Sequence, residues 1–212
     1  MVDIKTELMN CGEIHIPIAI VVDKSITMTG RIEELNDAFK KFEKFLQEDE
    51  LLLGRPEVTI ISFNSTVQIE VPFCLATEYR APILAVDGDD GRSLNEAMST
   101  VIDVIEERVQ LYRLKDMSYY RPFIFVLTGG AATDDENEAT AKVKIRDCIE
   151  RRKREFIFTV IGDVDISSLQ KYYPENEQQK TVLKGDSIKM VFDWLMNYLF
   201  FRTRVCENFL RE

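Results

Sequence analysis

The feature that most constrains the fold is a run of apolar residues that ends in a short polar motif. Residues 14–29 read IHIPIAIVVDKSITMT, and the stretch 18–22 contains no polar residue. A strand without polar positions is typical of the centre of a parallel sheet, where helices cover both faces. The sequence therefore predicts an α/β fold built around a strand at 17–22.

The polar motif that follows this strand is Asp-x-Ser-x-Thr, formed by Asp23, Ser25 and Thr27. One carboxylate and two hydroxyls are hard oxygen ligands, which suit Mg²⁺ or another small divalent cation better than zinc or iron. A helical pattern begins after Gly30, so we expect the motif in a strand-to-helix loop, where open α/β sheets bind ligands. The alternative is structural, because Asp, Ser and Thr also satisfy backbone groups at the start of a helix.

The rest of the chain alternates between helical and strand-like patterns. Apolar residues at a spacing of three and four indicate amphipathic helices, and short apolar runs bounded by turn residues indicate strands. On these grounds we expect helices at 32–46, 94–109, 134–150 and 188–199, strands at 57–63, 66–72, 123–128, 156–162 and 180–185, and a short helix at 168–173.

Three local features carry their own expectations. In the 66–72 strand, Val67, Ile69 and Val71 alternate with polar residues, which predicts an edge strand with one face in water. Thr133 is placed to cap the helix that follows it. The basic run ERRKRE at 150–155 is expected on a solvated surface near the end of that helix.

Strands that alternate with helices, together with one hairpin, predict a doubly wound α/β fold with a mostly parallel central sheet and one antiparallel edge strand. No internal repeat and no linker rich in Pro, Gly or Ser divides the chain. We therefore expect a single domain at 1–202, with 203–212 as a C-terminal helical extension or tail.

Composition narrows the choice of partners and compartment. Lys and Arg number 27 against 37 Asp and Glu, and the net charge of −10 disfavours nucleic acid and anionic membranes as partners. No apolar stretch approaches the roughly 20 residues of a membrane span. The four cysteines are widely separated, and the start of the chain has no basic, signal-like segment. We therefore expect free thiols and a cytoplasmic location.

The order of elements, together with the Asp-x-Ser-x-Thr motif, resembles a von Willebrand factor A (VWA) domain over roughly residues 14–202. The segments SFNSTVQIEVPF at 62–73 and KMVFDWL at 189–195 are most similar to bacterial VWA proteins of tellurium-resistance and stress operons. The resemblance implies a metal-ion-dependent adhesion site formed by three loops. The first of these loops corresponds to Asp23, Ser25 and Thr27, with a threonine hydroxyl at the third position.

The other two loops depart from the family pattern. The second normally supplies a threonine, but the matching stretch GRSLNEAM at 91–98 has Arg92 at that position, followed by Ser93. The third normally supplies an aspartate, and Gly129 stands in its place. If Arg92 points inward, it can pair with Asp23 and repel a cation.

We therefore expect a degenerate site, no firmly bound cofactor, and Mg²⁺ or Mn²⁺ binding no tighter than millimolar. The variant Arg92→Thr with Gly129→Asp is expected to raise that affinity at least tenfold, about 1.4 kcal/mol. The alternatives are that Ser93 together with Asp89, Asp90, Asp134 or Asp135 rebuilds the site, or that a partner supplies the missing ligand.

The resemblance implies a non-enzymatic interaction module that presents the carboxyl-end rim of its sheet to a partner protein in a bacterial stress or signalling system. A kinase or phosphatase of the same operon is one expected partner. The residues expected at the partner or metal site are Asp23, Ser25, Thr27, Arg92, Ser93 and Gly129.

Two other functions would need residues that this sequence lacks. A haloacid-dehalogenase-like phosphatase would use Asp23, but it needs a second aspartate as general acid and base where Ser25 stands. A nucleotide-binding protein of the doubly wound class would need a glycine-rich phosphate loop after the first strand, and no such motif is present. The only histidine, His15, precedes the first strand, which disfavours catalysis by a histidine base.

Overall fold

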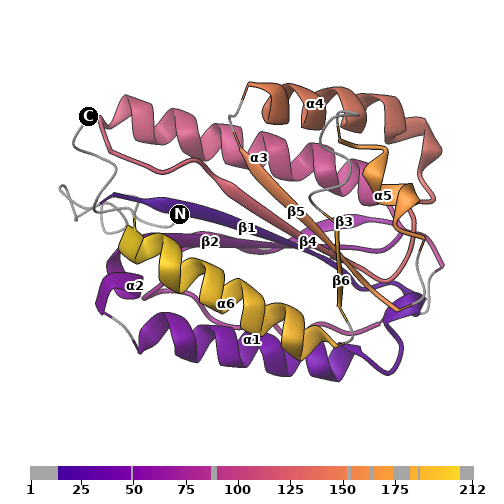
Figure 1. Ribbon diagram of the computed structural model, residues 1–212, viewed down its shortest axis with the longest axis horizontal. Coiled ribbons are helices and arrows are strands. Elements are labelled where there is room, and N and C mark those ends of the chain that lie inside the picture. Colours follow the sequence, from indigo (N-terminus) through magenta and orange to yellow (C-terminus); the bar gives the residue numbers. More distant parts are fainter. Residues whose placement is uncertain are drawn as a thin grey trace.

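The computed structural model describes residues 14–48, 50–86, 90–151, 154–162, 165–173, 182–185 and 187–205. In this part of the chain, six strands form one sheet in the order β3-β2-β1-β4-β5-β6, with helices on both faces (Figure 1). The strands are β1 (Ile16–Asp23), β2 (Pro56–Phe63), β3 (Val67–Leu75), β4 (Phe123–Thr128), β5 (Glu155–Ile161) and β6 (Val182–Gly185). The α-helices are α1 (Ile32–Gln47), α2 (Glu50–Gly54), α3 (Leu94–Leu114), α4 (Glu138–Glu150), α5 (Ser167–Gln170) and α6 (Ile188–Val205).

The predicted doubly wound architecture is confirmed. Strand β1 pairs in parallel with β2 and β4, and β5 and β6 continue the parallel sheet. Only β3 runs antiparallel, against β2, and it forms one edge of the sheet. None of the helices in the described residues is both long enough and apolar enough to cross a membrane.

Strand β1 lies between two hydrophobic layers, which explains its uniform composition. All eight of its residues are buried. Ile18, Ile20 and Val22 pack on the side of α1 and α6, whereas Ala19 and Val21 pack on the side of α3 and α4. Because neither face of the strand meets water, a polar residue at these positions would lose its hydration without gaining a partner.

The prediction that Val67, Ile69 and Val71 share one face of β3 is wrong. Ile61 pairs with Ile69, but the preceding residue Ile60 pairs with Val71, so the strand carries a bulge between these pairs. A bulge inserts an extra residue and changes which side the next residues face. Val67 therefore packs on the α3 side and Val71 on the α1 side, while Ile69 remains 43% exposed.

A buried polar cluster joins the first two strands to α3 near the amino end of β1. Glu57 accepts hydrogen bonds from Arg108 Nε (2.5 Å) and Tyr112 Oη (2.6 Å), and its second oxygen lies 2.7 Å from His15 Nδ1. Burial disfavours the charged form of Glu57, but the bond from His15 and the charge of Arg108 outweigh it, so the pKa of Glu57 is lowered. The chain's only histidine therefore has a structural partner at this end of the sheet.

The basic run at 150–155 and the C-terminal extension differ from expectation or lie partly outside the described residues. Arg154, in the basic run expected on a solvated surface, is buried, where it forms an ion pair with Glu106 and donates to Cys148 Sγ (3.2 Å). Residues 152 and 153 of that run lie outside the described residues. At the C-terminus, 203–205 continue α6, and the rest of the expected extension, 206–212, also lies outside them.

Candidate interaction site at the carboxyl edge of the sheet

Asp23 is the centre of the candidate site because it ends the central strand and is fully buried. Its Oδ1 accepts the Ser25 backbone N–H (2.8 Å), and its Oδ2 accepts the Gly129 backbone N–H (2.9 Å). The hydroxyls of Thr27 and Thr128 each lie 3.2 Å from Oδ2. Both carboxylate oxygens therefore already have protein donors from two loops.

The side chains of Ser25 and Thr27 belong to the same network. Residues 26–28 form a short 3-10 turn after β1, which brings Ser25 Oγ to 2.9 Å from Thr27 Oγ1. A consistent proton arrangement has Ser25 donating to Thr27 and Thr27 donating to Asp23. The structure thus brings the three motif residues together, as the sequence predicted.

Gly129 leaves no space beside Asp23 for the missing aspartate of the family pattern. A Cβ atom on Gly129 would lie 2.8 Å from Thr27 Oγ1 and 3.3 Å from Met28 Sδ. The Gly129→Asp change therefore requires Thr27 to shift before a second carboxylate can face the site.

Arg92 reaches the rim but does not form the expected pair with Asp23. Its Nε donates to the Ala131 carbonyl (2.7 Å), and its Nη1 lies 3.4 Å from the Asp90 carbonyl. The guanidinium group lies against Gly130, where a Cβ atom would approach Nε to 2.8 Å. The 129–131 loop holds Arg92 in this position, and the oxygens of Asp23 are already occupied by nearer donors.

Ser93 and Asp134 both form hydrogen bonds around the start of α3. Ser93 Oγ donates to the Ser65 carbonyl (2.9 Å). Asp134 accepts the backbone N–H groups of Asn95 (3.1 Å) and Glu96 (2.8 Å), so it caps α3 from a different loop. The expectation that Thr133 caps the following helix is wrong, because its hydroxyl accepts the backbone N–H of Arg92.

Two rim residues were missed by sequence reasoning. The sequence pattern indicates Thr128 only as the end of a buried strand, although its hydroxyl lies beside Asp23. Arg31 lies on the loop before α1, where its Nη1 is 3.4 Å from the Thr27 carbonyl. It also packs over Gly162 at the end of β5, where a Cβ atom would lie 3.1 Å from Arg31 Nη2. In the sequence, Arg31 stands eight residues after Asp23 and directly before the helix that follows the motif loop, and this position is the feature that points to it.

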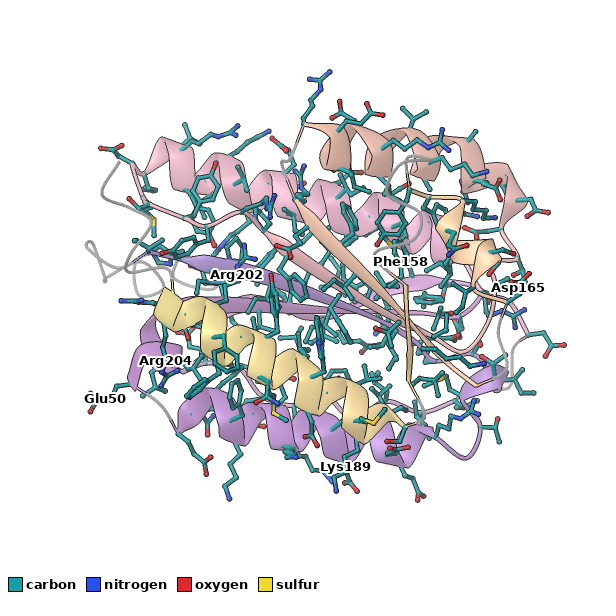
Figure 2. The ribbon with its side chains drawn as sticks, in the orientation of Figure 1. Glu50, Phe158, Asp165, Lys189, Arg202 and Arg204 are labelled. Carbon is teal, nitrogen blue, oxygen red and sulfur yellow. The ribbon has the colours of Figure 1, made fainter. Side chains whose placement is uncertain are left out.

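Among the described residues, no second carboxylate takes part in the hydrogen bonds around Asp23. No group of three or more His, Cys, Asp and Glu side chains in the described ranges is arranged to hold a metal ion. Asp165 lies at the same end of the molecule (Figure 2), but its carboxylate accepts the hydroxyl and the backbone N–H of Ser167. Those bonds lower the pKa of Asp165 and fix the start of α5.

Solved structures with the same fold include a byssus matrix protein, a pilus adhesin and a VWA protein. Proximal thread matrix protein 1 from the mussel byssus superposes with a TM-score of 0.61 at 12% identity, covering 88% of this chain and 47% of that one. The pilus adhesin SpaC from Lactobacillus rhamnosus GG, in its open conformation, gives 0.64 at 13% identity, covering 91% and 30%. The ArnB paralog VWA2 from Sulfolobus acidocaldarius gives 0.54 at 12% identity, covering 87% and 45%.

The chain spans less than half the length of these proteins, and at such identities the likeness shows the fold alone. One structure of the mussel protein has a zinc-occupied MIDAS motif, the metal-ion-dependent adhesion site. The comparison with curated proteins found no significant match.

The family assignment rests on a match that covers most of the sequence. The profile of the von Willebrand factor type A domain matches residues 18–191, which include the Asp-x-Ser-x-Thr motif, the sheet from β1 to β6 and the start of α6. This chain therefore belongs to the von Willebrand factor type A domain family.

Proposed function

We propose that this VWA domain is a non-enzymatic interaction module that binds a protein partner at the carboxyl-end rim of its sheet, without needing a metal ion. The observation that carries the proposal is the state of Asp23, whose two oxygens accept hydrogen bonds from within the protein. The rim residues proposed to serve the partner site are Asp23, Ser25, Thr27, Arg92, Ser93 and Gly129.

The donor set supports weak cation binding. Mg²⁺ requires near-octahedral oxygen coordination and is usually bound through one or two carboxylates together with waters. Here one buried carboxylate is available, and Thr27 occupies the space beside Gly129. A bound cation would have to displace the Ser25 and Gly129 N–H groups from Asp23. Otherwise it would have to bind oxygen atoms that already have hydrogen-bond partners within the protein.

The setting is proposed from the sequence resemblance and from the thiols. Segments 62–73 and 189–195 resemble bacterial tellurium-resistance and stress-operon proteins, which favours a cytoplasmic stress or signalling role with an operon-encoded kinase or phosphatase as partner. The domain is proposed to span 1–202. Cys74 and Cys148 form no disulfide in the described part of the chain, which is compatible with a reducing compartment.

A phosphatase activity at Asp23 is not favoured. The position that would supply general acid and base catalysis holds Ser25, whose hydroxyl is hydrogen-bonded to Thr27. A serine hydroxyl stays protonated at neutral pH, so it cannot act as a general acid and base as a carboxyl group does.

The proposal is tested by capture of partners from a lysate of the native host, with and without EDTA, followed by mass spectrometry. Ile26 is 42% exposed on the rim turn, and Leu114 is 82% exposed at the far end of α3. We expect a partner that is retained in EDTA, lost with Ile26→Asp and kept with the matched control Leu114→Asp. Capture that disappears in EDTA, or that is the same for both variants, would contradict the proposal.

A further inference from the structure

We infer that the partner offers an acidic segment to this rim, and that Arg31 and Arg92 bind it directly with their guanidinium groups. The inference rests on the proposed function, because it assumes that the rim is the interaction surface. It goes further by naming the chemistry of the partner and a residue, Arg31, outside the family motif.

Each of the two guanidinium groups lies over a glycine, and the missing side chain of that glycine leaves the space for it. Arg92 lies over Gly130 at the end of β4, and Arg31 lies over Gly162 at the end of β5. Gly162 has a φ of +96°, a conformation that disfavours residues with a side chain. Any Cβ atom at either glycine would come within about 3 Å of the guanidinium group above it. The ends of two adjacent strands thus each make room for one arginine.

The charges of these two arginines are not balanced by carboxylates in the described residues. The guanidinium groups of Arg31 and Arg92 have hydrogen bonds only to backbone carbonyls there, those of Thr27, Ala131 and Asp90. Most other arginines of the described ranges form ion pairs, as Arg108 does with Glu57 and Arg202 with Glu155. Lys24, the nearby lysine after β1, is paired with Glu70 (3.2 Å).

Two guanidinium groups without a carboxylate partner among the described residues are unexpected in a chain of net charge −10. The carboxylate of Asp23 is buried and engaged with its own donors, so it neutralises neither of them. Carbonyl bonds orient a guanidinium group and leave N–H donors for an oxygen anion, which arginine binds in a planar, bidentate manner. Because the arginines sit on separate loops, an extended segment with several anionic groups fits better than a single ion.

The test is fluorescence anisotropy with labelled peptides and the intact chain. The probes are a hexaglutamate peptide, a phosphoserine peptide of the same length, and hexalysine as the opposite-charge control. Glutamate and phosphoserine both supply oxygen anions, and comparison of their affinities distinguishes a carboxylate partner from a phosphorylated one. The variants are Arg31→Ala, Arg92→Ala and Arg92→Gln, of which the last keeps an N–H donor near the Ala131 carbonyl.

The matched control is Arg146→Ala, because Arg146 on α4 also donates to a carbonyl, that of Lys171. It removes the same charge from α4 and not from the loops that carry Arg31 and Arg92. At about 50 mM salt we expect an anionic peptide to bind the wild type, with a loss of about fivefold or more in each rim variant and less than about twofold in Arg146→Ala. Any binding of hexalysine, which the net charge of −10 favours, is expected not to weaken in the rim variants.

Two results would overturn the inference: no binding of either anionic peptide to the wild type, or equal losses in the rim variants and in Arg146→Ala. Failure of this inference is distinguishable from failure of the proposed function. If the host partner is still captured in EDTA, is lost with Ile26→Asp, and is unaffected by Arg31→Ala and Arg92→Ala, the rim remains an interaction site and only the acidic chemistry is wrong.

Discussion

At the scale of single residues, Glu57 is the position where one atom change should matter most for stability. Its carboxylate is completely buried and compensates Arg108, with further contacts to His15 and Tyr112. Glu57→Gln keeps the shape but leaves the arginine charge buried without its counter-charge. We expect a loss of about 3–5 kcal/mol in the free energy of unfolding, measured by urea denaturation at pH 7.

The pH dependence of stability follows from the direction of the shift at Glu57. Its pKa is lowered from the ordinary value of 4.5, so the folded state holds the ionised form more strongly than the unfolded chain does. This contribution is complete above pH 4.5 and is lost as the pH falls through the folded-state pKa. Glu57→Gln should flatten the acid limb of the stability curve. Glu48→Gln, an exposed glutamate paired with Lys44, is the control and should leave that limb unchanged.

The sequence predicted which motif residues meet but not how the rim is filled. Asp23, Ser25 and Thr27 share one loop, so their proximity follows from local spacing. The position of the Arg92 side chain depends on a loop 39 residues later in the chain, where the Ala131 carbonyl accepts the Nε–H of Arg92. The role of Thr128 likewise depends on parallel pairing between β1 and β4. Contacts of this kind are set by tertiary structure, and no local pattern encodes them.

At the scale of secondary-structure elements, α3 depends on a cap that comes from elsewhere in the chain. Asp134 accepts the N–H groups of Asn95 and Glu96, and it is itself buried. Asp134→Ala should lower the free energy of unfolding by about 1–2 kcal/mol, because two N–H groups at the helix start lose their acceptor. Thermal or urea unfolding measures this loss.

The neighbouring acidic residue provides the control for the capping prediction. Asp135 is exposed and begins the 3-10 turn before α4. Asp135→Ala should change stability by less than about 0.5 kcal/mol, as is usual for surface positions. A similar cost for Asp134→Ala and Asp135→Ala would show that the Asp134 cap contributes little.

Most elements were predictable because their burial pattern is strong. The strand at 123–128 coincides with β4, and the helix predicted from 32 begins at the first residue of α1. The edge position of the 66–72 strand is confirmed, but its one-faced alternation is not, because bulges in β3 interrupt it and leave no reliable sign in a pattern of period two. The prediction that Arg154 lies on a solvated surface was wrong for a related reason, since its burial depends on the ion pair with Glu106 of α3.

At the scale of the whole molecule, the thiols report on the compartment in which the chain works. Cys74 and Cys148 form no disulfide in the described part of the chain, and Cys11 and Cys206 lie outside it. We expect all four cysteines of the freshly purified protein to react with a thiol reagent in denaturant without prior reduction. A count below four free thiols would contradict the proposed cytoplasmic location.

The central claim is that this VWA domain uses its rim without a metal ion, and isothermal titration of the wild-type protein with MnCl₂ tests it most directly. Asp23 accepts bonds from Ser25 and Gly129, and Thr27 occupies the space that a second carboxylate would need. We expect a dissociation constant of about 1 mM or weaker. The variant Arg92→Thr with Gly129→Asp should bind at least tenfold more tightly, about 1.4 kcal/mol, if Thr27 shifts to admit the aspartate. Micromolar binding of Mn²⁺ by the wild-type protein would contradict the account.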